Sequence, residues 1–147
     1  MARSIKNIVA DLVATDAEEA REELERANWY SNPVLRRVIA LRDGGSCAYC
    51  GLAIGDGTDE PVSLDHVHPQ SKAGKHTPRN LVAVCRYCNS QKGAATFERA
   101  FRNTALKRGN SRPDGRRPGS PSQCRREAER RLQLDYTAPL LAELGFN

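Results

Sequence analysis

The chain has 147 residues, of which 39% are apolar, so it is long enough for one ordinary domain and too short for two full hydrophobic cores. It carries 23 Lys and Arg against 18 Asp and Glu, a net charge of +5. No segment approaches the roughly 18 apolar residues of a membrane span, and the N-terminus lacks a signal-peptide pattern. These features argue against a membrane protein and predict a soluble, intracellular protein of the cytoplasm.

The positive charge is concentrated in the middle of the chain. Residues 1–30 carry 4 basic and 7 acidic groups, and residues 132–147 carry 2 acidic ones. Residues 31–107 carry 11 basic and 6 acidic groups, and residues 108–131 carry 8 and 3. A polyanion such as nucleic acid would face these two basic segments. An excess of this size also occurs on surfaces that only face water, so charge alone leaves both interpretations open.

Residues 1–45 are predicted to form an N-terminal helical region. A first helix is indicated by apolar residues at helical spacing, namely Ile5, Ile8, Val9, Leu12 and Val13. Thr15 and Glu18 have the spacing of a capping box, which predicts that a second helix opens at Thr15 and runs to about Ala27.

A third helix is predicted to start at Asn32-Pro33, with asparagine as the cap and proline in the first turn, and to end at Gly44-Gly45. Trp29 and Tyr30 lie between the second and third helices. Because a small helical layer with few aromatic residues needs its large side chains for burial, we expect both to anchor the core rather than to contact a ligand.

The pattern changes in residues 46–107. Residues 62–68 alternate with the period of a strand, a polar loop follows, and residues 80–84 read as a second strand. A helix is expected from the second cysteine pair to about Gly93, and Thr96 is expected to cap another. Strands followed by helices predict an α+β fold for this region.

The C-terminal part divides into two predicted regions. Residues 108–122 are rich in arginine, proline, glycine and serine, which predicts a flexible linker. Residues 123–147 are predicted to be a helical tail, with one helix from about Gln123 and a short apolar one at Pro139–Leu144. The short helix is expected to pack back on the N-terminal helices.

Four of the five cysteines form two C-x-x-C pairs, Cys47 with Cys50 and Cys85 with Cys88. Four thiolates are the ligand set of a closed tetrahedral zinc site, which stabilises a fold and leaves no open position for chemistry. The alternatives are four reduced cysteines or a redox pair. The 34 residues between Cys50 and Cys85 exceed the spacing of a short zinc ribbon, so a sizeable insert is expected there. Cys124 falls outside the pattern and is interpreted as an incidental thiol.

Polar residues with metal-binding and catalytic chemistry lie inside this insert and directly after it. The segments Leu64-Asp65-His66-Val67-x-Pro69, Asn80-Leu81-Val82 and Cys85-x-x-Cys88-Asn89-x-x-Lys92-Gly93 resemble the ββα-metal, or HNH, nucleases, in the subgroup with a Cys₄ zinc. The resemblance covers about residues 46–98. It implies a two-stranded hairpin and a helix, stapled by structural zinc at the four cysteines.

The resemblance also implies a division of chemical roles. His66 would be the general base, Asp65 and Asn89 would hold a single Mg²⁺ or similar divalent cation, and Asn80 would orient the loop and the imidazole. Elementary geometry is compatible with the first two roles, because adjacent strand residues face opposite ways and Asp65 and His66 would not crowd one metal. A histidine also has the near-neutral pKa that activates water.

Other residues depart from the family pattern or have weaker signals. Asn89 stands where the family often has histidine, and the family's loop glycine pair appears here as Ala73-Gly74. His68 is a candidate auxiliary ligand or phosphate contact, whereas His76 is expected to be an ordinary loop residue. The candidate phosphate contacts are Lys72, Lys75, Arg86 and Lys92.

The sequence therefore favours a metal-dependent endonuclease that hydrolyses the phosphodiester bonds of DNA. The arginine-rich tail suggests contact with double-stranded DNA at weak sequence preference. The alternative functions are a zinc-stapled DNA-binding module that does not cleave, or an accessory subunit of a phage or restriction assembly that binds protein partners through its helical flanks.

Overall fold

A computed structural model describes residues 3–102 and 116–146 of the chain. Its elements, in chain order, are α1 (Ile5–Thr15), α2 (Glu18–Glu25), α3 (Pro33–Arg42), β1 (Ser63–His66), the 3-10 turn η1 (Gln70–Lys72), β2 (Leu81–Val84), α4 (Arg86–Lys92), α5 (Phe97–Phe101), α6 (Pro121–Leu132) and α7 (Thr137–Leu144). The predicted α+β class is confirmed. None of the helices in the described residues is long and apolar enough to cross a lipid bilayer.

The centre of the fold is the antiparallel hairpin of β1 and β2. Ser63 pairs with Val84 at one end of the hairpin, and His66 pairs with Leu81 at the other. Cys85 follows β2 directly and caps α4. We call the end with Ser63, Val84 and Cys85 the cysteine end, and the end with His66 and Leu81 the histidine end. The strands are shorter than the predicted 62–68 and 80–84, although the Val67 N–H still donates to the Asn80 carbonyl at 2.9 Å just beyond them.

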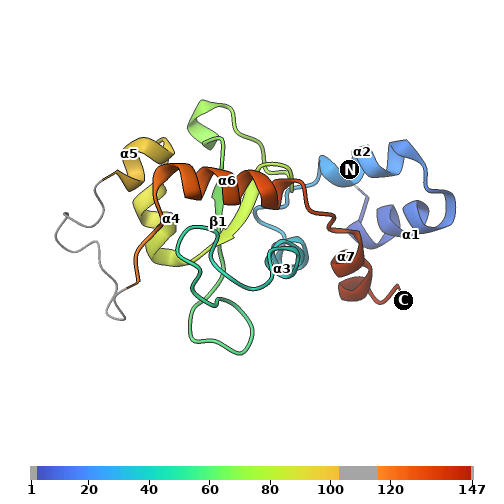
Figure 1. Cartoon of the computed structure of the whole chain (residues 1–147). Helices are drawn as coiled ribbons and strands as arrows, with labels where there is room; N and C mark the ends of the chain where they lie inside the picture. Colours follow the sequence, from blue (N-terminus) through green and yellow to red (C-terminus); the bar gives the residue numbers. More distant parts are fainter. Residues whose placement is uncertain (1–2, 103–115, 147) are drawn as a thin grey trace.

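Helices pack against both strands of the hairpin. α3 and α6 pack against β2, α4 packs against β1, and α5 packs against α4 and α6. Figure 1 shows α6 running across the hairpin, although it is far from it in the sequence. All four residues of β2 are buried as a result, in keeping with their continuous apolar run.

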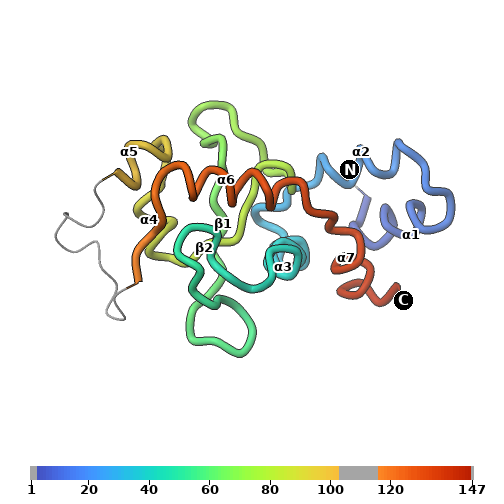
Figure 2. The backbone as a smooth tube through the Cα atoms, in the orientation of Figure 1, coloured from blue at the N-terminus to red at the C-terminus, as the bar shows by residue number. Residues whose placement is uncertain are grey.

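α1 and α2 lie at the opposite end of the molecule from α4 and α5 (Figure 2). α1 and α2 pack together, and α7 packs against α3, as expected for the apolar C-terminal helix. Trp29 is fully buried, its indole N–H donates to the carbonyl of Leu24 at 2.9 Å, and its ring meets the edge of Tyr136. The prediction that Trp29 anchors the core is confirmed.

The helix boundaries both confirm and correct the predicted caps. Asn32 accepts two backbone N–H groups at the start of α3, and Thr96 accepts one at the start of α5, as predicted. The predicted capping box at Thr15 is wrong. Thr15 is the last residue of α1, and its hydroxyl donates back to the carbonyl of Asp11 at 2.8 Å. The chain turns at Asp16, whose φ of 48° ends α1, so α2 starts at Glu18 without a side-chain cap.

The start of α6 also differs from the prediction. Ser120 and Gln123 form a capping box, with Pro121 in the first turn, so the helix begins inside the segment predicted as linker. Residues 103–115, which include most of that linker, lie outside the described residues. The division of the chain into four regions stays a prediction, but α6 packs on the hairpin rather than apart from it.

A buried charged cluster ties α3 and α6 to the hairpin. Asp43 accepts the Ala83 backbone N–H at 2.7 Å and pairs with Arg42 at 2.8 Å and with Arg131 at 3.7 Å. Arg131 also donates to the carbonyl and the hydroxyl of Ser46 at 2.6 and 2.9 Å. Because every buried charge here has partners, the cluster holds the segment before Cys47 against β2.

Candidate functional site

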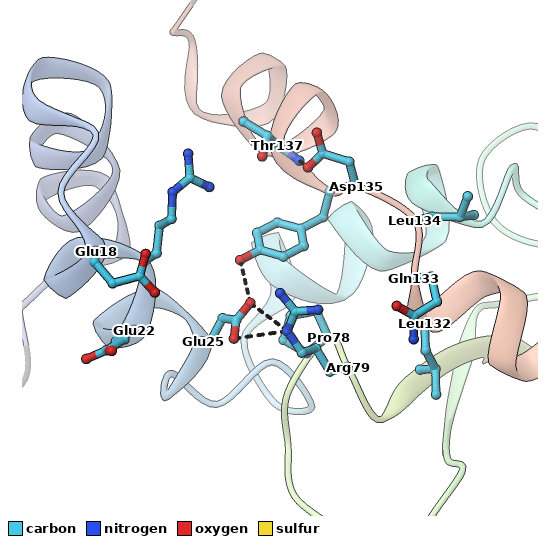
Figure 3. Close-up of a pocket in the computed structure, with 12 residues that line it drawn as sticks. Glu18, Glu22, Glu25, Pro78, Arg79, Leu132, Gln133, Leu134, Asp135 and Thr137 are labelled. Carbon is cyan, nitrogen blue, oxygen red and sulfur yellow. Dashed lines mark hydrogen bonds and ion pairs between the residues drawn. The ribbon is translucent and has the colours of Figure 1, made fainter.

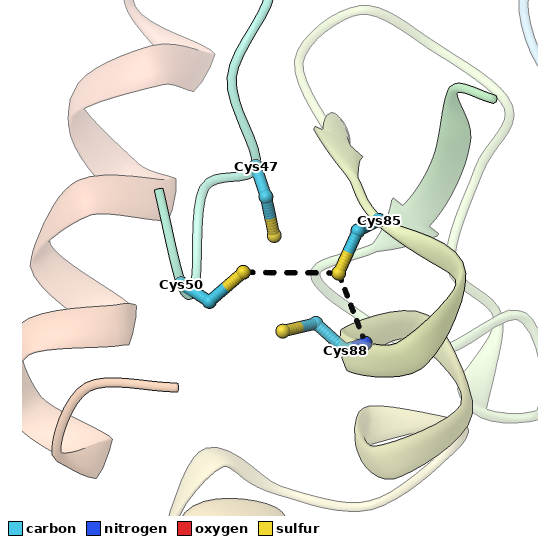
Figure 4. A group of neighbouring side chains, drawn as sticks. All are labelled: Cys47, Cys50, Cys85 and Cys88. Carbon is cyan, nitrogen blue, oxygen red and sulfur yellow. Dashed lines mark hydrogen bonds between the residues drawn. The ribbon is translucent and has the colours of Figure 1, made fainter. Parts of the chain in front are cut away.

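The four paired cysteines meet at the cysteine end of the hairpin. Their Sγ atoms all lie within 4.8 Å of one another, and Figure 4 shows the sulfurs turned toward a common centre. Cys47 and Cys50 come from the turn before β1, whereas Cys85 and Cys88 come from the start of α4. The two pairs are brought together by the fold, and the cluster could hold a metal ion.

Backbone N–H groups donate to two of the four thiols. The backbone N–H of Tyr49 donates to Sγ of Cys47 at 3.4 Å, and that of Cys88 donates to Sγ of Cys85 at 3.4 Å. Hydrogen bonds among the four thiols lower the pKa of Cys47 and raise the pKa of Cys50 and Cys88. Donors directed at sulfur favour the charged form that metals bind.

Cys124 is a separate, buried residue of α6. Its thiol lies 3.5 Å from the carbonyl of Gly119 and 3.8 Å from that of Tyr49, both as acceptors. Burial raises the pKa of Cys124 to about 12, so this thiol stays protonated at neutral pH. The interpretation of Cys124 as incidental is corrected in one respect: it is a core residue that packs α6 against the first cysteine turn.

Asp65 points into the protein toward α4. Only 3% of its surface is exposed. The Tyr49 hydroxyl donates to its carboxylate at 2.6 Å, and the Lys92 ammonium, on α4, lies 3.4 Å from the same oxygen. Burial raises the pKa of Asp65, while Lys92 and Tyr49 oppose that shift. Asp65 is therefore a buried carboxylate with one cation beside it.

Lys92 differs from the expectation of a phosphate contact. Its side chain is 1% exposed, and its ammonium makes the ion pair with Asp65 and lies 5.2 Å from the centre of the Phe97 ring. Within the described residues this ammonium has no hydrogen bond. The prediction failed because burial of a lysine beside a carboxylate depends on α4 packing against β1, which the sequence does not indicate.

His66 lies at the other side of the same strand end and is half-buried. Its Nε2 is 2.8 Å from Nδ1 of His76, a hydrogen-bond distance. The Tyr30 ring lies 4.7 Å from the His66 ring and stacks on His76 at 5.4 Å. Burial first, and then the charges of His76 and Lys92, lower the pKa of His66. This imidazole is therefore neutral at physiological pH.

His76, Tyr30 and Tyr49 contact the predicted site residues, and the sequence does not predict these contacts. Tyr30 is half-buried against the two imidazoles, so its predicted role as a core anchor is incomplete. His76 was expected to be an ordinary loop residue. No pattern in the sequence pairs His66 with a residue ten positions later across an irregular loop.

Asn80 fastens that loop. Its side-chain oxygen accepts the His68 backbone N–H at 2.8 Å, and its amide donates to the carbonyls of His68 and Lys75 at 3.0 Å each. Gly74 is required at the tip, because a Cβ there would lie 1.7 Å from the His68 carbonyl oxygen. The loop is thereby closed on itself beside His66.

The remaining predicted residues lie on α4 and on the loop. Asn89 is half-buried on α4, the helix that packs against β1. His68, Lys72 and Lys75 are exposed on the loop. Arg86 is exposed at the start of α4 and pairs with Glu60 at 3.4 Å. Lysines on the loop are thus available to a ligand, whereas Arg86 already has a carboxylate partner.

A pocket lies between α2, the end of the loop at Pro78 and Arg79, and the connection from α6 to α7 (Figure 3). Glu25 accepts hydrogen bonds from Arg79 at 3.0 Å and from Tyr136 at 3.3 Å within it. Glu18, Glu22 and Asp135 also line the pocket. Carboxylates repel phosphate, so this pocket does not suit a nucleic-acid backbone.

Comparison with known proteins identifies the central region. Residues 47–95 match the HNH endonuclease family. The chain is 32% identical to the CRISPR-associated endonuclease Cas9 of Corynebacterium diphtheriae over 110 residues, which are 71% of this chain and 10% of that protein. It is 38% identical to the CRISPR-associated endonuclease Cas9 of Actinomyces naeslundii over 88 residues, 56% of this chain and 8% of that protein.

The chain thus spans about a tenth of the length of each of these two relatives. No solved structure matches it. The matched window begins at the first cysteine of the cluster and includes the hairpin, His66 and α4. Residues 47–95, the central region of the chain, therefore belong to the HNH endonuclease family.

Proposed function

We propose that the protein is a metal-dependent endonuclease that hydrolyses phosphodiester bonds of double-stranded DNA, with weak sequence preference. The observation that carries the proposal is the arrangement at the end of β1. Asp65 faces inward to α4 and His66 faces the loop, where its imidazole is neutral. One strand end thus supplies a ligand oxygen and a base on opposite sides.

The cysteine cluster fits a structural zinc ion. For zinc–sulfur bonds of about 2.3 Å, the sulfurs of a regular tetrahedron lie about 3.8 Å apart. The Sγ atoms of Cys50 and Cys85 are 3.8 Å apart, and the whole set lies within 4.8 Å. With all four positions taken by cysteine, this ion would stabilise the fold and take no part in hydrolysis.

The donors near β1 and α4 fit a hard divalent cation such as Mg²⁺. Asp65 offers carboxylate oxygens and Asn89 an amide oxygen, the ligand types such cations prefer. When bound, the cation would neutralise the charge that develops on the phosphate. Lys92 already lies 3.4 Å from the Asp65 carboxylate, so the buried anion has a cationic partner before any metal arrives.

His66 would act on a water molecule beside the phosphate. The imidazole lone pair accepts a proton from the water O–H as the water oxygen attacks phosphorus, and the bond to the leaving oxygen breaks. Asn80 keeps the loop closed next to this histidine. The exposed Lys72 and Lys75 on that loop would contact backbone phosphates without reading sequence.

Plasmid cleavage tests the proposal. We expect the full chain to convert supercoiled DNA to nicked or linear forms with Mg²⁺ or Mn²⁺, and to lose this activity in EDTA. His66→Ala should reduce cleavage by about 100-fold or more. Asn7→Ala, an exposed position on α1, serves as the matched control and should cleave normally.

The DNA-binding module without catalysis is the competing outcome. If the wild type retards DNA in a gel but leaves plasmid intact across several divalent metals, the protein binds without cutting. If His66→Ala cleaves as fast as the wild type, the assignment of the base is wrong. Comparable zinc content and circular dichroism spectra of all variants would exclude misfolding as the cause.

A further inference from the structure

Hydrogen bonds to two other parts of the chain fix the backbone around His76, although it lies in a polar loop. Its backbone carbonyl accepts the N–H of the fully buried Trp29 at 3.0 Å. The neighbouring carbonyl, that of Lys75, accepts the Asn80 amide at 3.0 Å. The backbone of His76 is thus fixed both to the N-terminal helical region and to the residue that closes the loop.

The His76 side chain is fixed as well. Tyr30 stacks on its ring with an interplanar angle of 22° and also contacts His66. Tyr30 is in turn held by Arg36, which donates to the Tyr30 carbonyl at 2.7 Å and places its guanidinium 5.6 Å from the ring centre. Arg36 also donates to the carbonyl of Val62, next to β1.

The contact between the two imidazoles has only two neutral forms. Either Nε2–H of His66 donates to the lone pair on Nδ1 of His76, or Nδ1–H of His76 donates to Nε2 of His66. In the first form the lone pair on Nδ1 of His66 is free. In the second form the proton of His66 is on Nδ1 and its lone pair is already used, so the ring cannot accept a proton from water.

We propose that His76 is a positioning residue: its Nδ1 accepts the Nε2–H of His66, which fixes the ring and leaves Nδ1 of His66 as the proton acceptor. The inference rests on the proposed role of His66 as the base. When one ring nitrogen of a histidine is hydrogen-bonded to a fixed partner, the ring has one defined tautomer and one defined orientation. The N-terminal helical region, through Trp29 and Tyr30, therefore contributes to the site.

Nitrogen-15 NMR of the full, zinc-loaded chain tests this directly, because two-bond proton–nitrogen spectra report which nitrogen carries the proton. We expect His66 of the wild type to be protonated at Nε2 above pH 7.5. His76→Asn places an amide oxygen where Nδ1 stands, so it should keep this tautomer and most of the cleavage rate. His76→Leu removes the acceptor, so it should give mixed tautomers and cleave about 10-fold more slowly.

The outcomes separate this inference from the proposed function. A wild-type His66 protonated at Nδ1 would overturn the positioning role, whatever the activity. So would a His76→Leu variant with the wild-type tautomer and rate. If the tautomer is the expected one but His66→Ala still cleaves DNA, His76 does position His66, and the assignment of His66 as the base is wrong. Thermal melting of both His76 variants shows whether they fold.

Discussion

The two ends of the β1–β2 hairpin differ in how far their side chains are buried. The cysteine end is closed: three of its four sulfur ligands are buried, and its neighbours are charges satisfied inside the protein. The histidine end is partly open, with half-buried imidazoles beside exposed lysines. Under the proposed function, the closed end stabilises the fold and the open end receives the substrate, so a hairpin of four-residue strands would combine both tasks.

Removal of the metal should have the largest effect and should act through the cysteine end. Structural zinc contributes on the order of 10 kcal/mol in small metal-stabilised domains, more than a domain of this size can spare. We expect chelation, or Cys85→Ser, to abolish the near-ultraviolet circular dichroism of the folded domain. A chelated protein that keeps this spectrum would show that the cluster does not support the fold.

Loss of the buried carboxylate at Asp43 should be the next largest effect. Asp43→Ala leaves Arg42 and Arg131 without their shared partner and should destabilise the protein by about 4 kcal/mol, or roughly 10 °C in melting temperature. Asp56→Ala, which removes an exposed ion pair with Arg37, is the control and should cost less than about 1 kcal/mol. Equal melting temperatures for the two variants would contradict the view that the cysteine end depends on satisfied buried charge.

Lys92→Met should have a smaller effect, because it removes one buried cation, next to Asp65. The variant leaves the Asp65 carboxylate buried without its cation, so without a divalent metal the free energy of unfolding should fall by about 3 kcal/mol. Mg²⁺ should restore more stability to the variant than to the wild type, since the site has lost its competing charge. Denaturant titrations with and without Mg²⁺ measure both effects, and an equal response to Mg²⁺ would argue against Asp65 as a ligand.

The smallest effect concerns pH and the histidine end alone. A base must be neutral, and the pKa of His66 is lowered from the ordinary value of 6.5. The cleavage rate should therefore decline only as pH falls below 6.5, as His66 takes up a proton. His76→Asn removes one of the charges that lower this pKa, so its acid limb should move up toward 6.5. Profiles of kcat/KM against pH test this, and an acid limb above 6.5 in the wild type would be incompatible with His66 as the base.

The sequence predicts the cysteine pairs, β2 and the starts of two helices well, because the signals for these features are local. The C-x-x-C spacing, the caps at Asn32 and Thr96, and the continuous apolar run of β2 each depend on residues within a few positions. The prediction from local pattern is wrong at Thr15, where one pattern fits two structures. The pattern at Thr15 also fits a helix end, and only the packing of α1 on α2 decides between the two.

The histidine end was only partly predictable, for the opposite reason. His66 and Asp65 were identified from a motif, but their partners come from distant parts of the chain: Tyr30 from before α3, Tyr49 from the first cysteine turn, and His76 from the loop. No periodicity encodes such contacts. The burial of Lys92 was missed because lysine is ordinarily exposed, and tertiary packing overrode that tendency.

The buried Cys124 is a built-in probe of local opening, in which α6 moves away from the first cysteine turn. With a metal on the other four cysteines, all five thiols are protected, four by coordination and one by the packing of α6. A thiol reagent would therefore label Cys124 only in molecules whose α6 has moved away from the first cysteine turn. The labelling rate would report the free energy of that local opening separately from the loss of metal.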